Sequence, residues 1–191
     1  MKPYLVASEF IDFHHPKVAA KARELAADNE LETTRRCFEF VRDEIKHSRD
    51  CQAPVSTCRA SEVLEHSTGY CYAKSHLLAA LLRANGIPTG LCYQRLTFRD
   101  DKPPYCLHGL NAVYLPQHGW YRVDARGNKE GVNAQFYPPQ EQLAFAILHP
   151  GEADLPEIWA EPLPLVTEVL LGAHNWKEVE QRLPDIELIA V

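Results

Sequence analysis

A cysteine stands where the sequence changes into a long apolar helical pattern. The stretch TGYCYAKSHLLAALLRANGIPTG holds Cys71 shortly before its leucines begin and ends soon after Gly-Ile-Pro. In the first turn of a helix, unpaired backbone N–H groups and the positive end of the helix dipole stabilise a thiolate. Cys71 is therefore a candidate nucleophile. The alternative is a cysteine that only packs in the core, since free cysteine is among the most buried residue types.

A cysteine nucleophile needs a base that shares its proton and a third group that orients the base. Two downstream segments, HGLNAVYL and WYRVDA, have the pattern of strands and are joined by the turn PQHG. His108 opens the first segment and Asp124 closes the second, so an antiparallel hairpin places the two side by side. One ring nitrogen of His108 can then face Asp124 while the other faces a neighbouring thiol.

The elements that must position these residues are helices that precede strands along the chain. Apolar spacing predicts helices at about 16–28, 30–46, 61–69, 71–85 and 176–183. The strand pattern predicts strands at about 89–98, 108–115 and 120–125, with a loop at 99–105. This order indicates an α+β fold, in which the helix that begins at Cys71 packs on one antiparallel sheet.

The 191 residues suffice for one domain with a sizeable core. We expect a single domain over 1–191, with a catalytic core at about 30–130. A helical segment at 1–29 precedes this core. An irregular extension at about 137–191 follows it, with only short helical pieces before the last predicted helix. The sequence indicates neither the role of this extension nor the oligomeric state.

Composition and charge argue against several classes of partner. The chain has 20 lysines and arginines against 26 aspartates and glutamates, and its formal net charge is −6. Because it has no basic block, nucleic acid and anionic membranes are not expected partners. No apolar run approaches the roughly 20 residues of a membrane span, and the N-terminus lacks the apolar region of a signal peptide. We therefore expect a cytoplasmic protein whose six cysteines stay reduced.

Three blocks of the sequence together resemble the transglutaminase-like superfamily, whose core is papain-like. They are FEFVRDEIKHSRD, GYCYAKSHLLAALLRANGIPTG and HGLNAVYLPQHGWYRVDA, which span roughly 38–125. The resemblance implies that Cys71 is the nucleophile, His108 the base and Asp124 the orienting acid. Two departures leave the substrate class open: HGL stands where the family often has His-Ala-Trp, and DARGNK where it often has Asp-Pro.

The resemblance implies a cysteine-dependent enzyme of the acyl-transfer class that requires no metal or organic cofactor. Cys71 would attack a carboxamide or peptide carbonyl and form a thioester. Water resolves that thioester in a protease or amidase, and an amine resolves it in a transglutaminase. We favour hydrolysis, because water is abundant and no segment that would exclude it can be identified. The substrate stays open between a peptide, a protein and a small amide.

The oxyanion that forms in such a reaction needs hydrogen-bond donors, and the backbone N–H of Cys71 is one candidate. The resemblance implies a second donor from a side chain upstream of the nucleophile. His47 and Gln52 lie in the loop after the second predicted helix and are the candidates.

Other side chains near the predicted site allow more than one interpretation. Trp120 could pack within the hairpin or shield the imidazole of His108. Arg126 and Lys129 follow Asp124 closely in the sequence. They could contact an anionic part of a substrate or simply be solvated.

Three other classes of protein stay open. The first is a non-catalytic protein-interaction domain on the same fold. The second is a structural zinc-binding domain that uses Cys51, Cys58, Cys106 and His108, although zinc-binding cysteines are usually separated by only about two to four residues. The third is an enzyme like the arylamine N-acetyltransferases, which have comparable Cys–His–Asp spacing but an Arg-Gly-Gly-x-Cys motif that HSTGYC lacks.

Overall fold

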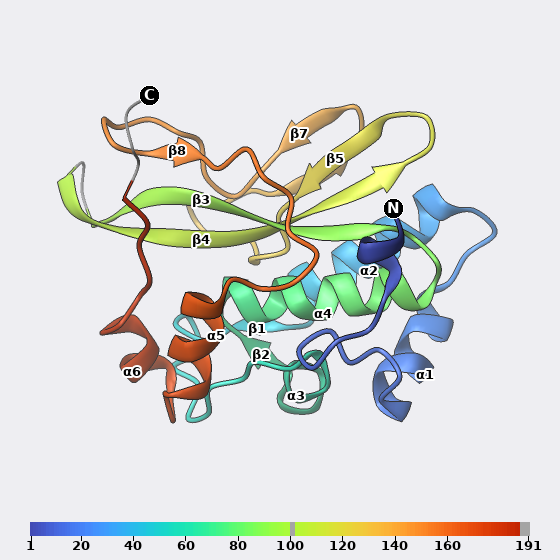
Figure 1. The fold of residues 1–191 in the computed structure, drawn as a ribbon, viewed down its shortest axis with the longest axis horizontal. Helices are drawn as coiled ribbons and strands as arrows, with labels where there is room; N and C mark the ends of the chain where they lie inside the picture. Colours follow the sequence, from blue (N-terminus) through green and yellow to red (C-terminus); the bar gives the residue numbers. More distant parts are fainter. Residues whose placement is uncertain (100–101, 188–191) are drawn as a thin grey trace.

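The computed structural model describes residues 1–99 and 102–187 (Figure 1). Its helices are η1 (Lys2–Leu5), α1 (Pro16–Leu25), α2 (Glu30–Asp43), α3 (Ala60–His66), α4 (Cys71–Ala84), α5 (Pro164–Leu171) and α6 (Trp176–Glu180). Its strands are β1 (Lys46–His47), β2 (Thr68–Gly69), β3 (Thr89–Arg99), β4 (Lys102–Leu115), β5 (Gly119–Val123), β6 (Gln135–Tyr137), β7 (Gln140–Gln142) and β8 (Ala153–Asp154). The predicted α+β fold is confirmed.

The second predicted helix ends earlier than its apolar pattern indicates. The side chain of Asn29 accepts a hydrogen bond from the backbone N–H of Glu32 and caps the start of α2, as expected. At its other end α2 ends at Asp43, because the next residues form β1 and pair in parallel with β2. His47 is thereby placed opposite Gly69, shortly before the helix that begins at Cys71.

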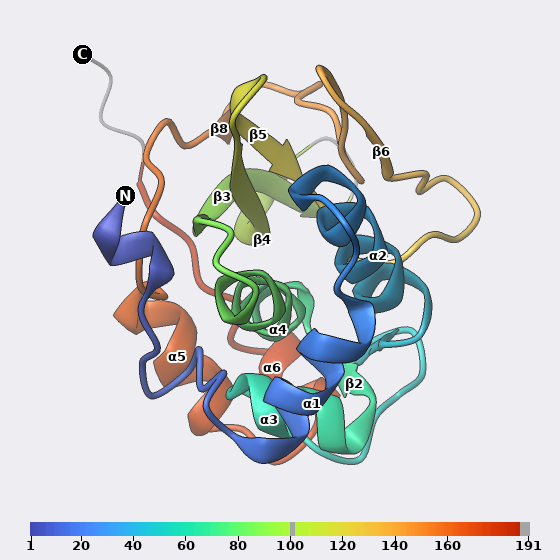
Figure 2. The ribbon, with the colours of Figure 1, turned by 90° about the vertical axis from the view of Figure 1, so that its right-hand side faces the viewer.

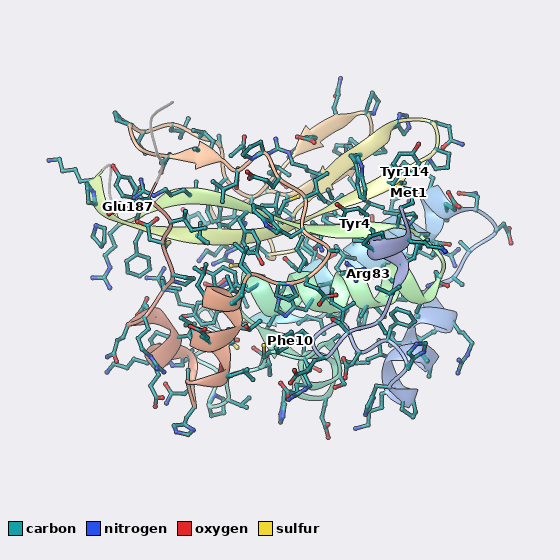
Figure 3. The ribbon with its side chains drawn as sticks, viewed as in Figure 1. Met1, Tyr4, Phe10, Arg83, Tyr114 and Glu187 are labelled. Atoms are coloured by element: carbon teal, nitrogen blue, oxygen red, sulfur yellow. The ribbon has the colours of Figure 1, made fainter. Side chains whose placement is uncertain are left out.

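Helix α4 is the centre of the molecule. Figure 2 views this helix end-on, with the sheet on one side and α1, α2, α3 and α5 around the rest. Every residue from Cys71 to Arg83 is buried, so the predicted apolar face extends around the whole helix. The buried polar side chains therefore donate to backbone carbonyls. Arg83, labelled in Figure 3, donates from Nε to the carbonyl oxygen of Thr89 at 2.9 Å and from Nη1 to that of Val6 at 2.9 Å.

The main sheet has the strand order β5-β4-β3-β8, and all its pairs are antiparallel. Strand β4 begins at Lys102 rather than at His108, because the β3–β4 hairpin stays paired as far as Arg99 and Lys102. The prediction of a loop at 99–105 is therefore wrong for residues 102–105, which belong to β4. Residues 100–101 lie outside the described part of the chain. The consequence for the site is that His108 lies within a long strand rather than at its start.

The C-terminal extension is more regular than the sequence indicates. Strand β8 pairs with β3, and α5 places Val166 and Leu170 in the same hydrophobic core as α4. Helix α5 was not among the predicted helices, because its short segment PLVTEVLL is almost uniformly apolar and has no amphipathic period. The backbone N–H of Leu107 donates to the carbonyl of Pro184 at 2.7 Å, which places the end of the described chain against β4.

The two ends of the sheet differ in what covers them. Tyr4 lies near one end and packs against Trp120, with 4.9 Å between their ring centroids. Glu187 lies at the other end, as the labels in Figure 3 show. In the described residues, no helix is long and apolar enough to cross a membrane.

Candidate active site

Cys71 is the first residue of α4, as predicted, and its side chain lies against β4 where that strand extends past β5. The N–H groups in the first turn of a helix have no partner within the helix. Strand β5 ends at Val123, so the edge of β4 is free of β5 beyond Asn111. There the backbone N–H of Gly109 donates to the sulfur of Cys71 at 3.4 Å. The residue is only 6% exposed.

Polar contacts fix the start of α4 against β4. The hydroxyl of Tyr72 donates to the carbonyl of Leu107, and the amide of Asn111 donates to the carbonyl of Ser75 at 3.0 Å. The hydroxyl of Ser75 donates in turn to the carbonyl of Cys71 at 2.8 Å. The thiol therefore lies on a helix turn whose position relative to β4 is set by direct hydrogen bonds.

His108 and Asp124 are brought together by the strand register. Because Asn111 pairs with Val123, Asp124 falls opposite Leu110 and on the same face of the sheet as His108. The Nε2 atom of His108 lies 2.7 Å from a carboxylate oxygen of Asp124. Nδ1 is the ring nitrogen left to face Cys71, whose sulfur accepts a hydrogen bond from the backbone N–H of Gly109, the residue next to His108. The structure thus brings the three predicted residues into one contact chain.

The charge state of this chain follows from its surroundings. Burial alone would lower the pKa of His108, but the negative charges of Asp124 and Cys71 and hydrogen bonds to both raise it to about 10. Burial would raise the pKa of Asp124, and the charge of His108 with hydrogen bonds lowers it. Backbone N–H groups of Arg126 and Ala144 donate to this carboxylate at 3.1 and 3.0 Å. The imidazole is therefore cationic and the carboxylate anionic at neutral pH.

A phenylalanine that the sequence analysis missed covers the imidazole. Phe145 makes an edge-to-face contact with His108, with 5.0 Å between ring centroids and 88° between planes. Trp120 does not shield the imidazole, since it packs on Tyr4 and Tyr114 instead. Phe145 lies in a segment without helical or strand periodicity, so no pattern in the sequence pointed to it.

The two candidate oxyanion side chains end up in different places. His47 borders the same cleft as Cys71 and makes an edge contact with Tyr70 at 5.0 Å between ring centroids. Burial first, then the nearby charge of Arg126, holds its pKa well below the usual range, so the ring is neutral at pH 7. Gln52 is exposed at a left-handed backbone position with a φ of 52° and does not line the cleft. The structure therefore does not bring Gln52 to the site.

A buried lysine, also missed, connects several parts of the site. Lys74 lies one helical turn after Cys71 and is fully buried. Its ammonium donates to the backbone carbonyl of Ile45, to that of Arg126 at 2.9 Å and to that of Arg42 at 3.4 Å. Burial, and then the charge of Arg126, lowers its pKa to about 7. A lysine in the first turns of a leucine-rich helix was the available signal in the sequence.

Gly109 allows β4 to approach the first turn of α4. A Cβ at this position would lie 2.9 Å from the ring of Tyr72 and 3.1 Å from its Cα. The glycine of the HGL stretch therefore bears on the position of the candidate nucleophile, because only glycine fits between β4 and the helix here.

Replacing Gly109 with alanine should separate Cys71 from His108 without removing either. We expect alkylation of Cys71 by iodoacetamide to slow about fivefold, because small displacements of reacting groups have large effects on rate. Peptide mapping by mass spectrometry measures this rate. Gly90→Ala is the matched control, since its Cβ would meet the side chain of Ile158 on a different part of the sheet. An equal slowing in both variants would contradict the argument from close approach.

The contact chain opens into a cleft of about 570 Å³. Its apolar lining includes Leu96, Phe98, Leu107, Phe145, Leu148 and Leu183. Its charged and ionisable lining comprises His47, Arg49, Cys71, Tyr70, Tyr72, Cys106, His108, Arg126, Lys129, His149 and Glu152. The cleft thus has space for a chain-like substrate beside the thiol, with polar and apolar walls.

The six cysteines are all free, and they differ in their surroundings. Cys37 and Cys92 are buried, and burial raises the pKa of each to about 12. Cys51 is exposed, and Cys58 is buried. Within residues 1–99 and 102–187, no three His, Cys, Asp or Glu side chains gather in a way that could hold a metal ion.

Comparison with solved structures finds distant similarities, of which the first described below reaches a TM-score of 0.50. One is a protein from Cytophaga hutchinsonii whose assignment as a cysteine protease is provisional, with a TM-score of 0.50 and 19% identity over 65% of this chain. Another is the periplasmic domain of TgpA from Pseudomonas aeruginosa, bound to ethylmercury, with a TM-score of 0.48 and 18% identity. The match to TgpA covers 65% of this chain. The chain spans 41% of the first structure and 47% of the second.

A comparison with curated proteins returned no match. A family model described as the transglutaminase-like superfamily matches residues 19–125. This match takes in more than half of the chain, including Cys71, His108 and Asp124, and it agrees with the fold of the first solved structure. The chain therefore belongs to the transglutaminase-like superfamily.

Proposed function

We propose that the protein is a cysteine-dependent enzyme that hydrolyses an amide or peptide bond through a thioester intermediate. The observation that carries the proposal is the contact chain from the Cys71 thiol through His108 to the buried Asp124 carboxylate. Membership of a superfamily that includes cysteine proteases and transglutaminases supports a cysteine-dependent reaction. The substrate would be a peptide, a protein or a small amide that enters the cleft.

In the first half of the reaction, the Cys71 sulfur attacks the carbonyl carbon of the substrate. His108 takes the proton of the thiol, and the charge of Asp124 favours the imidazolium form that this transfer produces. The C–N bond then breaks, the acyl group stays on sulfur, and His108 gives its proton to the departing amine. Asp124 keeps the ring oriented through the Nε2 hydrogen bond.

In the second half, water attacks the thioester and His108 accepts its proton. The carbonyl carbon leaves the sulfur as a carboxylic acid, and the thiolate–imidazolium pair is restored. Hydrolysis is favoured over transamidation because the rim of the cleft is accessible to water. Leu148 on that rim is 74% exposed, and the side chain of Lys129 is 45% exposed.

Two donors are proposed for the oxyanion of the tetrahedral intermediates. The first is the backbone N–H of Cys71, which is free at the start of α4. The second is the ring of His47, which borders the cleft beside Cys71. A neutral imidazole keeps one N–H to donate, and its lowered pKa keeps His47 in that form.

Two readouts on one peptide pool test this proposal. Wild type and Cys71→Ala are incubated with tryptic peptides from a denatured protein mixture and a labelled primary amine. Hydrolysis releases new peptide amino termini, whereas transamidation attaches the labelled amine to peptides. We expect new termini with wild type only. Amine attachment without new termini would replace hydrolysis with transamidation. Neither product, together with an inert Cys71 towards iodoacetamide, would favour a non-catalytic domain.

A further inference from the structure

One wall of the cleft carries a cluster of two cations and one carboxylate. Arg126 and Lys129 both line the cleft, and both donate to the carboxylate of Asp50. The Nη2 atom of Arg126 lies 3.1 Å from this carboxylate, and the Nζ atom of Lys129 lies 2.8 Å from it. One negative charge is therefore shared between two positive charges, and the cluster carries an excess of positive charge.

The two cations differ in how firmly they are held. The side chain of Arg126 is only 6% exposed, and its guanidinium binds both oxygens of Asp50. The side chain of Lys129 is 45% exposed, and its ammonium contacts one of those oxygens. Half-exposed ion pairs contribute little to stability. Lys129 can therefore leave Asp50 at small cost, while Arg126 continues to neutralise that carboxylate.

Two backbone hydrogen bonds hold the turn that carries Lys129. The backbone N–H of Lys129 donates to the carbonyl of Val132 at 3.1 Å, and the N–H of Val132 donates back at 2.9 Å. This tight turn follows soon after Asp124 and Arg126 in the sequence. The ammonium thus extends from a rigid turn close to the segment that orients His108.

Among the described residues that line the cleft, none offers a free counter-charge to Lys129. Glu152 is the carboxylate that lines the cleft within the described residues, and both its oxygens are already bound. One oxygen accepts from the N–H and hydroxyl of Thr97 at 2.9 and 2.7 Å. The other accepts from the N–H groups of Leu148 and His149 at 2.9 and 3.0 Å. The ammonium of Lys129 therefore has donors available for a carboxylate that enters with a substrate.

We propose that the substrate carries a carboxylate near the scissile carbonyl and that Lys129 binds it. This inference rests on the proposed function, since it names a feature of the substrate of that site. The carboxylate takes over the contact that Lys129 makes with Asp50, and Arg126 holds Asp50 in place. The apolar wall around Leu148 contacts the part of the substrate that lies away from the charge.

A pair of matched alkylating probes tests this preference. N-bromoacetylglycine and N-bromoacetylglycinamide differ only in a terminal carboxylate, and both alkylate thiols. The rate of Cys71 modification by each is measured in wild type, Lys129→Met and Lys17→Met. Lys17 is the control. It lies on α1, does not line the cleft and, like Lys129, pairs with a carboxylate, that of Glu65.

For each cysteine we take the ratio of the rate with the carboxylate probe to the rate with the amide probe. In wild type we expect this ratio to be higher at Cys71 than at exposed Cys51. Lys129→Met should lower the carboxylate-to-amide ratio at Cys71 about threefold, and Lys17→Met should leave it unchanged. High salt should reduce the wild-type ratio. An unchanged ratio in Lys129→Met, with Cys71 still reactive, would overturn the carboxylate inference alone. A Cys71 inert to both probes would overturn the proposed function and this inference with it.

Discussion

Alkylation of Cys71 by iodoacetamide at pH 6 is expected to slow about thirtyfold or more when His108 is replaced by glutamine. An ordinary thiol is almost entirely protonated at this pH, and only the thiolate reacts. The pKa of His108 is raised to about 10, so the imidazolium beside the sulfur persists from pH 6 to pH 9. Glutamine has a similar size but cannot carry this charge, and the thiolate loses its stabilising partner.

The pH profile distinguishes a paired thiolate from an accessible thiol. In wild type, the rate at Cys71 should depend less steeply on pH between 6 and 9 than the rate of glutathione, an ordinary thiol, because His108 stays cationic over this range. In His108→Gln, Cys71 should follow the same steep profile as glutathione. His66→Gln, at an exposed position, is the control and should behave as wild type. A flat profile for Cys71 in His108→Gln would show that another group stabilises the thiolate.

Replacing Lys74 with methionine is expected to lower the free energy of unfolding by about 3 kcal/mol. The three backbone carbonyls that accept from its ammonium would lose their partner in the interior, and an unpaired buried polar group costs about 1–3 kcal/mol. The substitution also removes the free-energy cost of burying a charged ammonium, and this gain offsets part of the loss. Urea unfolding at pH 6 measures the change.

Lys46→Met is the matched control for Lys74→Met, because Lys46 is exposed on β1. We expect its free energy of unfolding to stay within about 0.5 kcal/mol of wild type. Lys74→Met should also slow the alkylation of Cys71, since the carbonyl of Arg126 lies next to the segment that holds Asp124. A variant as stable as wild type would mean that water or a backbone shift satisfies these carbonyls.

Much of the candidate site could be predicted because its chemistry depends on residues within two short blocks. Cys71 stands at a helix start that its own sequence specifies, and His108 and Asp124 belong to one hairpin. Local pattern was sufficient to place Cys71 at a helix start and His108 beside Asp124, but the packing of that helix on the hairpin was not readable from it. The choice between His47 and Gln52 was not local, since it depends on the parallel pairing of β1 with β2.

The residues that were missed are defined by contacts across the chain. Gly109 is needed because Tyr72 approaches its backbone too closely for a Cβ. Lys74 is needed because it donates to backbone carbonyls of α2 and of the segment after β5. Phe145 reaches His108 from a segment with no secondary-structure period. Helix α5 was missed for a different reason, because a short apolar segment can be a strand or a helix equally well.

The two-residue pairing of β1 with β2 also makes this protein a practical scaffold for redesign. The N–H of Ser48 donates to the carbonyl of Gly69 at 3.0 Å, and the N–H of Ala60 donates to the carbonyl of Phe10 at 2.9 Å, so both ends of the loop at 49–59 are fixed. Surface loops with anchored ends tolerate changes in length and composition. A library that varies this loop can therefore alter what the cleft accepts, while His47 and Cys71 keep their positions.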